Sequence, residues 1–396
     1  VAARRLGAGD EARRLLYRAA MLNRNLERLD ETERLARELQ QLADAAGDAL
    51  AAGRAWLLLG RGHALRERFT EAAECYAACE QRLAPLGPSA ELADCLGGRV
   101  AIEYFAGRLE QALAYGERQL AIAQAAGTEE QVGAAHLSLS GVANHLPGHE
   151  TQALHHAEQA LAAGRRCGSL RLIAHAEVAL GHALRRLGRL DEALAHYEAG
   201  LAAPPSSLAP SSLANALYGV GLTHADRGDR ARAIDVHAKA LALAQANAAM
   251  GHARVCETAC ELVHLHLDKA DVQAATDALA IYVDAAISLA RAPHLAGAAL
   301  AVVRWRLHVG DAAGIADDLA LIVRFAELLD GLGQRRLRAV CAQAQHPPAT
   351  PRRPSAATTD GGEPMLEALL RRALPAIRSA ARPSRHAVAP ASAPLQ

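Results

Sequence analysis

The chain has 396 residues, and its 43 basic and 43 acidic side chains give a formal net charge of zero. This balance argues against a surface wholly devoted to nucleic acid, which needs an excess of Lys and Arg. Aromatic residues make up only 3% and hydrophobic residues 51% of the chain, so a core must be built mainly from Ala and Leu. Such side chains favour closely packed helices, and the sequence predicts an all-α protein.

The N-terminal stretch VAARRLGAGDEARRLL lacks the long apolar centre of a secretory signal, and nowhere do eighteen apolar residues follow one another. Seven cysteines, an odd number, fit a reducing compartment. These features predict a cytoplasmic protein. Because the first residue is Val rather than Met, we expect either an alternative start codon or a further segment upstream.

The first predicted element is a helical hairpin over residues 11–47. Its side chains recur at the three- and four-residue spacing of one helix face. The two expected apolar stripes are Leu15, Leu16, Ala19 and Leu22, followed by Leu35, Leu39 and Leu42. A terminal repeat lacks one neighbour, so we expect this hairpin to depart from the pattern of the others.

Seven further hairpins follow at a nearly constant stride. Their second helices are marked, at steps of 40, 41, 40, 40, 42 and 40 residues, by Ala72, Ala112, Ala153, Ala193, Ala233, Ala275 and Ile315. Twelve residues before these markers stand Gly60, Val100, Gly141, Gly181, Gly221, Val263 and Val303. The joints between hairpins share the period and are marked by Gly47, Gly87 with Pro88, Gly127, Gly168, Pro204 with Pro205, Asn247, Pro293 and Gly331. Two series with one period predict a solenoid, which grows by stacking repeats.

The hairpin over residues 180–205 is the clearest. Leu180 and Leu184 lie on one face of its first helix, and Gly188 suits the turn that follows. Asp191 and Glu192 open the second helix, because acidic side chains stabilise a helix N-terminus. The stretch therefore predicts two antiparallel helices.

This hairpin resembles the tetratricopeptide repeat (TPR), which combines a Leu-Gly pair, an Ala, an aromatic residue and a closing Pro. The residues that match are Leu180, Gly181, Ala193, Tyr197 and Pro205. The stride resembles the longer-helix bacterial variants, since simple TPR units have about 34 residues. The resemblance implies a right-handed superhelical solenoid of about eight antiparallel helical hairpins.

The sequence predicts three segments. Residues 1–344 are expected to form the solenoid, with an atypical first and last repeat. Residues 345–362 are rich in Pro, Gly, Ser and Thr and predict a disordered linker. Residues 363–396 predict a short basic amphipathic helix, kinked or ended by Pro375, and a disordered tail. The helix has three alternatives: it docks on the last repeat, lies on an anionic membrane surface, or does not fold.

In TPR proteins the first helix of each repeat lines a concave groove, and the resemblance implies which positions face a ligand. These positions carry Arg54, Arg61, Asp94, Tyr104, His145, His175, His182, Arg185, Asn215, Tyr218, Glu257, Cys260, His264, Arg304 and His308. Helix packing alone would accept Ala or Leu there. Because Arg presents planar donors to carboxylates, we expect an acidic segment or a free C-terminal carboxylate as partner. The alternative is a merely solvated surface.

A metal site is not predicted. Cys256, Cys260 and His264 follow one another at four-residue spacing on one expected helix. The helix rise between the first and the last is about 12 Å, too long for three ligands of one ion. We expect these cysteines, like Cys75 and Cys79, to be buried as small apolar residues.

Catalytic motifs are also missing: the sequence contains no phosphate-binding loop, nucleophile elbow or metalloprotease helix. We therefore predict no enzymatic activity and no cofactor. Histidines cluster at His155 with His156 and at His264 with His266, which leaves a pH-responsive groove as a further alternative.

We predict a non-enzymatic adaptor or regulatory module that binds a partner protein or peptide in its groove, without direct contact to nucleic acid. A bare face on a terminal repeat could also pair with a second copy. The alternative is the sensory region of a bacterial signalling protein, such as a diguanylate cyclase or a LuxR-like transcription activator, whose effector domain is missing from this chain.

Overall fold

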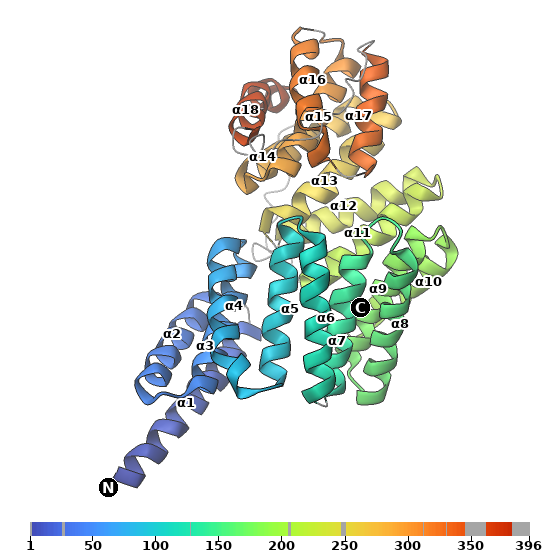
Figure 1. Cartoon of the computed structure of the whole chain (residues 1–396). Coiled ribbons are helices and arrows are strands. Elements are labelled where there is room, and N and C mark those ends of the chain that lie inside the picture. The colour runs from blue at the N-terminus through green and yellow to red at the C-terminus, as the bar shows by residue number, and fades with distance from the viewer. Residues whose placement is uncertain are drawn as a thin grey trace, which may run out of the picture. The chain divides into compact units, whose positions relative to one another are not determined.

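The computed structural model describes residues 2–25, 28–126, 128–204, 207–246, 251–311, 313–329, 331–344 and 362–381. All regular elements within these ranges are helices (Figure 1), which confirms the all-α prediction. Residues 345–361 of the predicted linker and residues 382–396 lie outside the described residues, as do the joint markers Gly127, Pro205 and Asn247. Residue 362, predicted as the end of the linker, is the first residue of a helix.

The contacts divide the chain into two compact units: unit 1 is Val1–Arg227 with Asn247–Gly251, and unit 2 is Gly228–Ala246 with His252–Gln396. Unit 1 contains α1 (Ala2–Asn25), α2 (Leu29–Ala46), α3 (Ala49–Leu65), α4 (Phe69–Leu83), the 3-10 turn η1 (Ala84–Leu86), α5 (Ala90–Phe105), α6 (Leu109–Ala126), α7 (Glu129–Ala143), α8 (Glu150–Cys167), α9 (Leu170–Arg186), α10 (Leu190–Leu201) and α11 (Pro210–Asp226). Unit 2 contains α12 (Arg230–Ala246), α13 (Gly251–Asp268), α14 (Val272–Leu289), α15 (Ala292–Val309), α16 (Ile315–Arg324), the 3-10 turn η3 (Ala326–Leu328), α17 (Gly331–Gln343) and α18 (Gly362–Ala380).

Side-chain caps fix where several of these helices begin. Asp48 accepts a hydrogen bond from the Ala51 amide at 3.0 Å, at the start of α3. Ser89 and Ser169 cap α5 and α9 in the same way. A capping oxygen satisfies an amide that has no partner inside the helix. The first helices of three repeats therefore start at defined residues.

A residue with positive φ closes the first helix of every repeat after the first hairpin. These residues are Glu67, Gly107, Gly148, Gly188, Gly228, Ala270 and Gly310. They follow one another at the same steps as the predicted markers of the second helices. Glu67 and Ala270 adopt φ values of 58° and 55°, in a region that costs a residue with a Cβ about 1–2 kcal/mol. The turn geometry is therefore kept even where the sequence lacks Gly.

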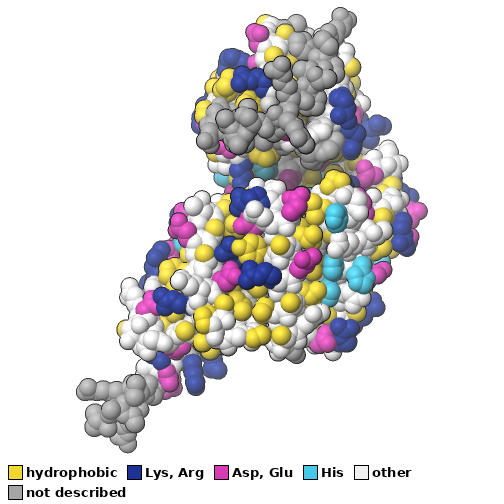
Figure 2. Space-filling view, viewed as in Figure 1, with side chains coloured by type: hydrophobic (Ala, Val, Ile, Leu, Met, Phe, Trp, Pro, Cys, Tyr) yellow, Lys and Arg dark blue, Asp and Glu magenta, His cyan; other side chains and the backbone are white. Residues whose placement is uncertain are grey.

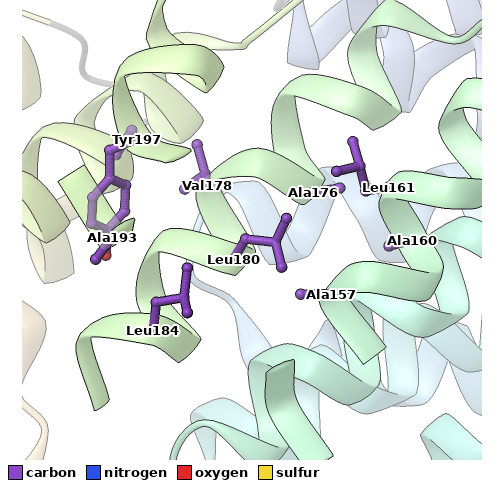
Figure 3. Packing of buried hydrophobic residues seen from close by; sticks show 10 residues of the cluster. Ala157, Ala160, Leu161, Ala176, Val178, Leu180, Leu184, Ala193 and Tyr197 are labelled. Atoms are coloured by element: carbon purple, nitrogen blue, oxygen red, sulfur yellow. The ribbon is translucent and has the colours of Figure 1, made fainter. Parts of the chain in front are cut away.

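The predicted small markers lie in the core. Ala72, Ala153 and Ala193 are completely buried. Around Ala193 the cluster includes Leu180 and Leu184 of α9 and the fully buried ring of Tyr197 on α10 (Figure 3). The space that Gly181 leaves is filled by this ring, since a Cβ on Gly181 would lie 2.7 Å from Tyr197 Cδ1. The TPR-like residues thus pack against one another.

Gly141 is a correction to the predicted series. It is exposed, and a Cβ there would have no neighbour within 4 Å. Ser140 packs instead, and its hydroxyl donates to the carbonyl of Ala153 at 2.9 Å. The reason is the connection between α7 and α8, residues 144–149, which is longer than the turn over residues 187–189 and shifts α7 by one residue against α8.

The first hairpin also corrects the sequence prediction. Leu15, Leu22 and Leu42, expected in the apolar stripes, are 57%, 64% and 41% exposed. Ala20 and Leu39 are completely buried. Within the described residues, α1 packs mainly against α2 and α3, so a narrower face of this helix is covered.

Helix α18 is the C-terminal helix for which the sequence left three alternatives: docking on the last repeat, lying on a membrane surface, or not folding. It packs against α14, α15 and α16, and Leu366, Leu370 and Ile377 are completely buried. The guanidinium groups of Arg372 and Arg378 lie 2.6 Å from Asp318 and Asp284. Its underlying helix α14 is long and apolar enough to span a membrane by composition, but here it packs against α15 and α18.

Candidate partner-binding surface

In unit 1 the first helices of the repeats form a continuous layer. Helix α3 contacts α5, α5 contacts α7, α7 contacts α9, and α9 contacts α11. Within the described part of unit 1, the even-numbered helices contact one another far less. The more closely spaced layer lies on the inside of a curved stack of repeats. We call the solvent side of the odd-numbered helices the inner face.

Two ion pairs join α3 to α5 on the inner face. Arg54 donates to a single carboxylate oxygen of Glu91 at 2.9 and 2.5 Å, and its guanidinium lies 5.0 Å from the centre of the Tyr17 ring. Arg61 donates to Asp94 at 2.9 Å. The side chains of Arg54 and Glu91 remain 31% and 20% exposed, so water or a ligand can reach them.

Similar pairs continue along the layer. The Tyr104 hydroxyl lies 2.9 Å from His145 Nε2, between α5 and the end of α7. Between α9 and α11, the same kind of lateral contact is made three times: His175 with Ser212 at 2.9 Å, His182 with Asn215 at 3.1 Å, and Arg185 with Asp226 at 2.8 Å. We call this series of pairs between successive odd-numbered helices the inner ladder.

The ladder has a simple sequence rule. Its partners are 33, 37 or 41 residues apart. Each separation is close to the length of one repeat, and successive values differ by about one helical turn. Sequence reasoning missed Glu91, Ser212 and Asp226. A search for complementary polar residues at these three separations would have found them.

The predicted groove residues of unit 1 thus lie on one face, and most of them contact another repeat. Asp94, His145, His182 and Asn215 are ladder members. Tyr218 is half-buried on α11. Figure 2 shows one side of the molecule, where basic and acidic side chains are interspersed rather than gathered into a patch of one sign. The arginines predicted to receive a ligand carboxylate already face carboxylates of this chain.

The remaining predicted residues lie in unit 2. Arg304 on α15 donates toward His264 Nδ1 of α13 at 2.8 Å and forms an ion pair with Asp268. His308 Nδ1 lies 2.8 Å from the carbonyl of Arg304. His264 is buried, so it serves packing between α13 and α15 rather than presenting itself to solvent.

Unit 2 contains a buried charge pair that the sequence analysis did not predict. Arg336 on α17 donates to both carboxylate oxygens of Glu261 on α13, at 3.1 and 2.7 Å, and lies 3.7 Å from the Cys260 sulfur. Glu261 is only 6% exposed. The two residues are 75 positions apart, nearly two repeats, so single-repeat spacing does not reveal them. Glu257 pairs with Arg254 at 2.5 Å within α13.

The thiols of the region are packed, as expected for cysteines used as small apolar residues. Cys75, Cys79 and Cys256 are buried, and Cys260 is half-buried. Burial raises the pKa of the Cys75 thiol to about 11. Among the described residues, no three His, Cys, Asp or Glu side chains come together to hold a metal ion.

Buried histidines in both units hold depressed pKa values. In unit 1, His136 Nδ1 on α7 lies 3.0 Å from His156 Nδ1 on α8, and burial followed by this neighbour lowers the pKa of His136 to about 4. In unit 2, burial lowers the pKa of His237 to about 4 and that of His264 well below its ordinary value. These rings are neutral in the folded chain near neutral pH.

We expect the free energy of unfolding to fall as the pH is lowered from 6.5 to 5. Unfolded histidines titrate near 6.5, whereas these titrate lower in the folded chain, so the unfolded state binds more protons in this window. Each fully affected histidine contributes a slope of about 1.4 kcal/mol per pH unit. Urea unfolding at pH 7.5, 6.5, 5.5 and 5.0 measures the effect. A His136→Gln variant should show a shallower fall, and an unchanged slope would contradict the assignment.

The comparisons with known proteins agree with this architecture. Residues 172–281 match the tetratricopeptide repeat family model. A comparison with curated protein sequences gives no match. Among solved structures, a Rap protein complexed with competence and sporulation factor is 15% identical, with a TM-score of 0.63 over 94% of this chain and 98% of that chain. NprR in complex with its cognate peptide NprX is 17% identical, with a TM-score of 0.56 over 84% of this chain and 98% of that one.

The apo form of the quorum sensor NprR from B. thuringiensis is 16% identical, with a TM-score of 0.56 over 93% of this chain and 98% of that one. Identities this low concern the fold alone. The residues that the family model matches run from α9 into α14. The chain therefore has an all-α fold similar to that of these solved structures, and the tetratricopeptide repeat is matched by its residues 172–281.

Proposed function

We propose that the chain is a non-enzymatic interaction module that holds a segment of a partner protein or peptide against the inner face of unit 1. The inner ladder carries this proposal. It places donors and acceptors of both signs, with the aromatic rings of Tyr17 and Tyr104, along one row of packed helices. Side chains positioned in this way lose little conformational freedom when a ligand binds.

The pairs keep capacity for a ligand. A guanidinium has five N–H donors and a carboxylate about four acceptor sites. Arg61 engages Asp94 through Nη2 and Arg185 engages Asp226 through Nη1. One contact uses only part of either group, so a peptide can add hydrogen bonds to both members of a pair. Solved proteins of similar fold are described in complex with peptides, NprX for NprR and Phr* for a Rap conjugation regulator.

The chemistry of the partner follows from the same pairs. An acidic side chain or a free C-terminal carboxylate, the partner predicted from the sequence, has to share Arg54 or Arg61 with Glu91 or Asp94. We therefore propose a partner segment with polar groups of both kinds, in which such a carboxylate is one anchor. Pairing of two copies through the first hairpin rests on the exposed side chains of Leu15 and Leu22.

Affinity capture from the native lysate tests the proposal. The chain is compared with a variant that carries Arg54→Glu, Arg61→Glu and Arg185→Glu. A matched control carries Arg82→Glu, Arg118→Glu and Arg166→Glu. These three arginines also form ion pairs between neighbouring helices, but they lie on even-numbered helices. We expect the first variant to lose the partners and the control to keep them. Equal recovery by both variants would contradict the proposal.

A regulatory region of a larger signalling protein is the second candidate function. It is favoured by the similar fold of a quorum sensor and of a conjugation gene regulator. Translation of the neighbouring DNA in all frames tests it, and an adjoining catalytic or DNA-binding reading frame is the expected result.

A further inference from the structure

A second surface, on the side of the even-numbered helices of unit 1, contains a cavity of about 340 Å³ between α8, α9 and α10. Its floor consists of Leu161, Leu180 and Leu184, which are 8%, 3% and 2% exposed. Leu180 and His182 are two positions apart on α9, which corresponds to a rotation of about 200° around the helix axis. Leu180 therefore lies nearly opposite His182, and the cavity faces away from the inner ladder. Figure 3 shows Leu180 among Leu184, Ala157 and Leu161. We call this surface the outer groove.

The outer groove corresponds, three repeats later in the chain, to the place that α18 occupies in unit 2. Gly188 and Gly310 hold the same turn position in their repeats and are 122 residues apart. The same shift carries α8, α9 and α10 onto α14, α15 and α16, the three helices against which α18 packs. The repeat therefore builds one kind of groove twice, and in unit 2 a helix of this chain fills it.

Four lining residues support the correspondence. The shift relates Leu184, Arg189, Glu192 and His196 of the outer groove to Arg306, Asp311, Gly314 and Asp318. These four residues of unit 2 line a space that Leu369, Arg372, Ala373 and Ala376 of α18 also border. Ala162 corresponds in the same way to Asp284, the partner of Arg378.

The corresponding place two repeats earlier in unit 1 is filled by its own side chains. Arg99 on α5 holds the position in its repeat that Leu180 holds on α9, and Tyr115 on α6 holds the position of His196 on α10. The Arg99 guanidinium donates to the Tyr115 hydroxyl and lies 4.5 Å from the centre of the Tyr115 ring. Arg118 lies over the same ring. The outer groove has Leu and His at these positions, and it keeps its cavity.

Charge decides which helix fits. In unit 2, Asp284, Asp311 and Asp318 stand beside the basic helix α18, and two of them pair with its arginines at 2.6 Å. The outer groove replaces them by Ala162, Arg189 and His196. Arg165 and Glu158 also line the groove. Arg189 pairs with Glu192 at 2.6 Å, and Glu177 lies 2.6 Å from His196 and 3.8 Å from Arg165. An exposed pair such as Arg189–Glu192 contributes little and can exchange partners.

We propose that the outer groove binds an amphipathic helix of a partner protein, with apolar residues toward Leu161, Leu180 and Leu184 and carboxylates where α18 carries Arg372 and Arg378. Helix-in-groove binding of this kind uses apolar anchors on one helix face. The α18 helix of a second copy does not fit, since Arg372 and Arg378 would meet His196 and Ala162 in place of Asp318 and Asp284. The site is separate from the inner face.

Two fluorescent peptides test the proposal on the full chain. The basic peptide has the sequence of residues 362–381, and the acidic peptide carries Glu in place of Arg371, Arg372 and Arg378. We expect the acidic peptide to bind at least tenfold more tightly than the basic one in fluorescence anisotropy. The variants Ala162→Trp, which fills the groove, and Arg189→Glu should each weaken the acidic peptide at least tenfold. Arg118→Glu, beside the closed groove, should leave it unchanged.

A gain of function completes the test. The triple variant Ala162→Asp, Arg189→Asp and His196→Asp reproduces the acids at 284, 311 and 318, and we expect it to bind the basic peptide at least tenfold more tightly than the original chain does. Circular dichroism verifies that each variant is folded. No binding of the acidic peptide up to 1 mM, equal binding of both peptides, or binding unaffected by Ala162→Trp would overturn the proposal. Partner capture by the inner face should be the same in all these variants.

Discussion

Replacing Gly181 by Ala is expected to destabilise unit 1 by about 2 kcal/mol, because the new methyl group overpacks the core. A Cβ at this position would lie 2.7 to 2.8 Å from three ring carbons of Tyr197. The ring cannot withdraw: a Cβ on Gly219 of α11 would also meet it, and its hydroxyl bonds to His182 Nδ1 at 2.8 Å. The gain in helix propensity from Gly to Ala, about 1 kcal/mol, offsets only part of the strain.

Gly141→Ala is the matched control for Gly181→Ala. Both residues stand twelve positions before the marker of their repeat, but Gly141 is exposed and has no neighbour for a Cβ within 4 Å. We expect this variant to be more stable by about 0.5–1 kcal/mol. Urea unfolding followed by circular dichroism compares the two. Shifts of the same sign would show that Tyr197 does not fill the space beside Gly181.

Replacing Arg336 by Ala is expected to destabilise unit 2 by about 3 kcal/mol, since it leaves the carboxylate of Glu261 buried without its bidentate partner. The double variant Glu261→Leu with Arg336→Leu should recover most of this loss, because it removes both charges from the interior. The loss and its recovery together identify a desolvated charge pair.

Trp305 provides the signal for this experiment. It is one of two tryptophans in the chain, it is buried in unit 2, and its indole donates to Thr276 at 2.8 Å. In a Trp56→Phe background its fluorescence reports unit 2 alone. Arg371→Ala, which removes an exposed pair with Glu367 on α18, should change stability by less than about 0.5 kcal/mol. Equal effects of Arg336→Ala and Arg371→Ala would refute the assignment.

The sequence was sufficient to predict the features that each repeat determines by itself. The markers from Ala72 to Ala275 predicted the hairpins because a constant stride is a property of the chain alone. The prediction that Gly141 packs against the second helix was wrong, because the longer connection between α7 and α8 moves one helix past the other without changing the period. The φ values of Glu67 and Ala270 were also invisible, since the turn is imposed by the flanking helices and not by these residues.

Contacts between repeats were harder to predict. The groove residues were placed on the odd-numbered helices, but Glu91 and Asp226 were missed because their positions depend on how far one helix is displaced along the next. Docking of α18 on the last repeat was one of three alternatives, but its individual contacts were beyond reach: Arg378 meets Asp284 across 94 residues, and no repeat spacing connects them. Asp318, which pairs with both Arg306 and Arg372, was not singled out for the same reason.

The most direct test of the inner face separates its role in binding from its role in folding. One variant carries Arg54→Glu and Arg61→Glu, and a second adds Glu91→Arg and Asp94→Arg, which restores both ion pairs with their charges exchanged. If the inner face holds the partner, the first variant loses both stability and the captured partners, and the second regains stability but still captures nothing. Recovery of the partners together with stability in the second variant would show that the ladder only joins the helices.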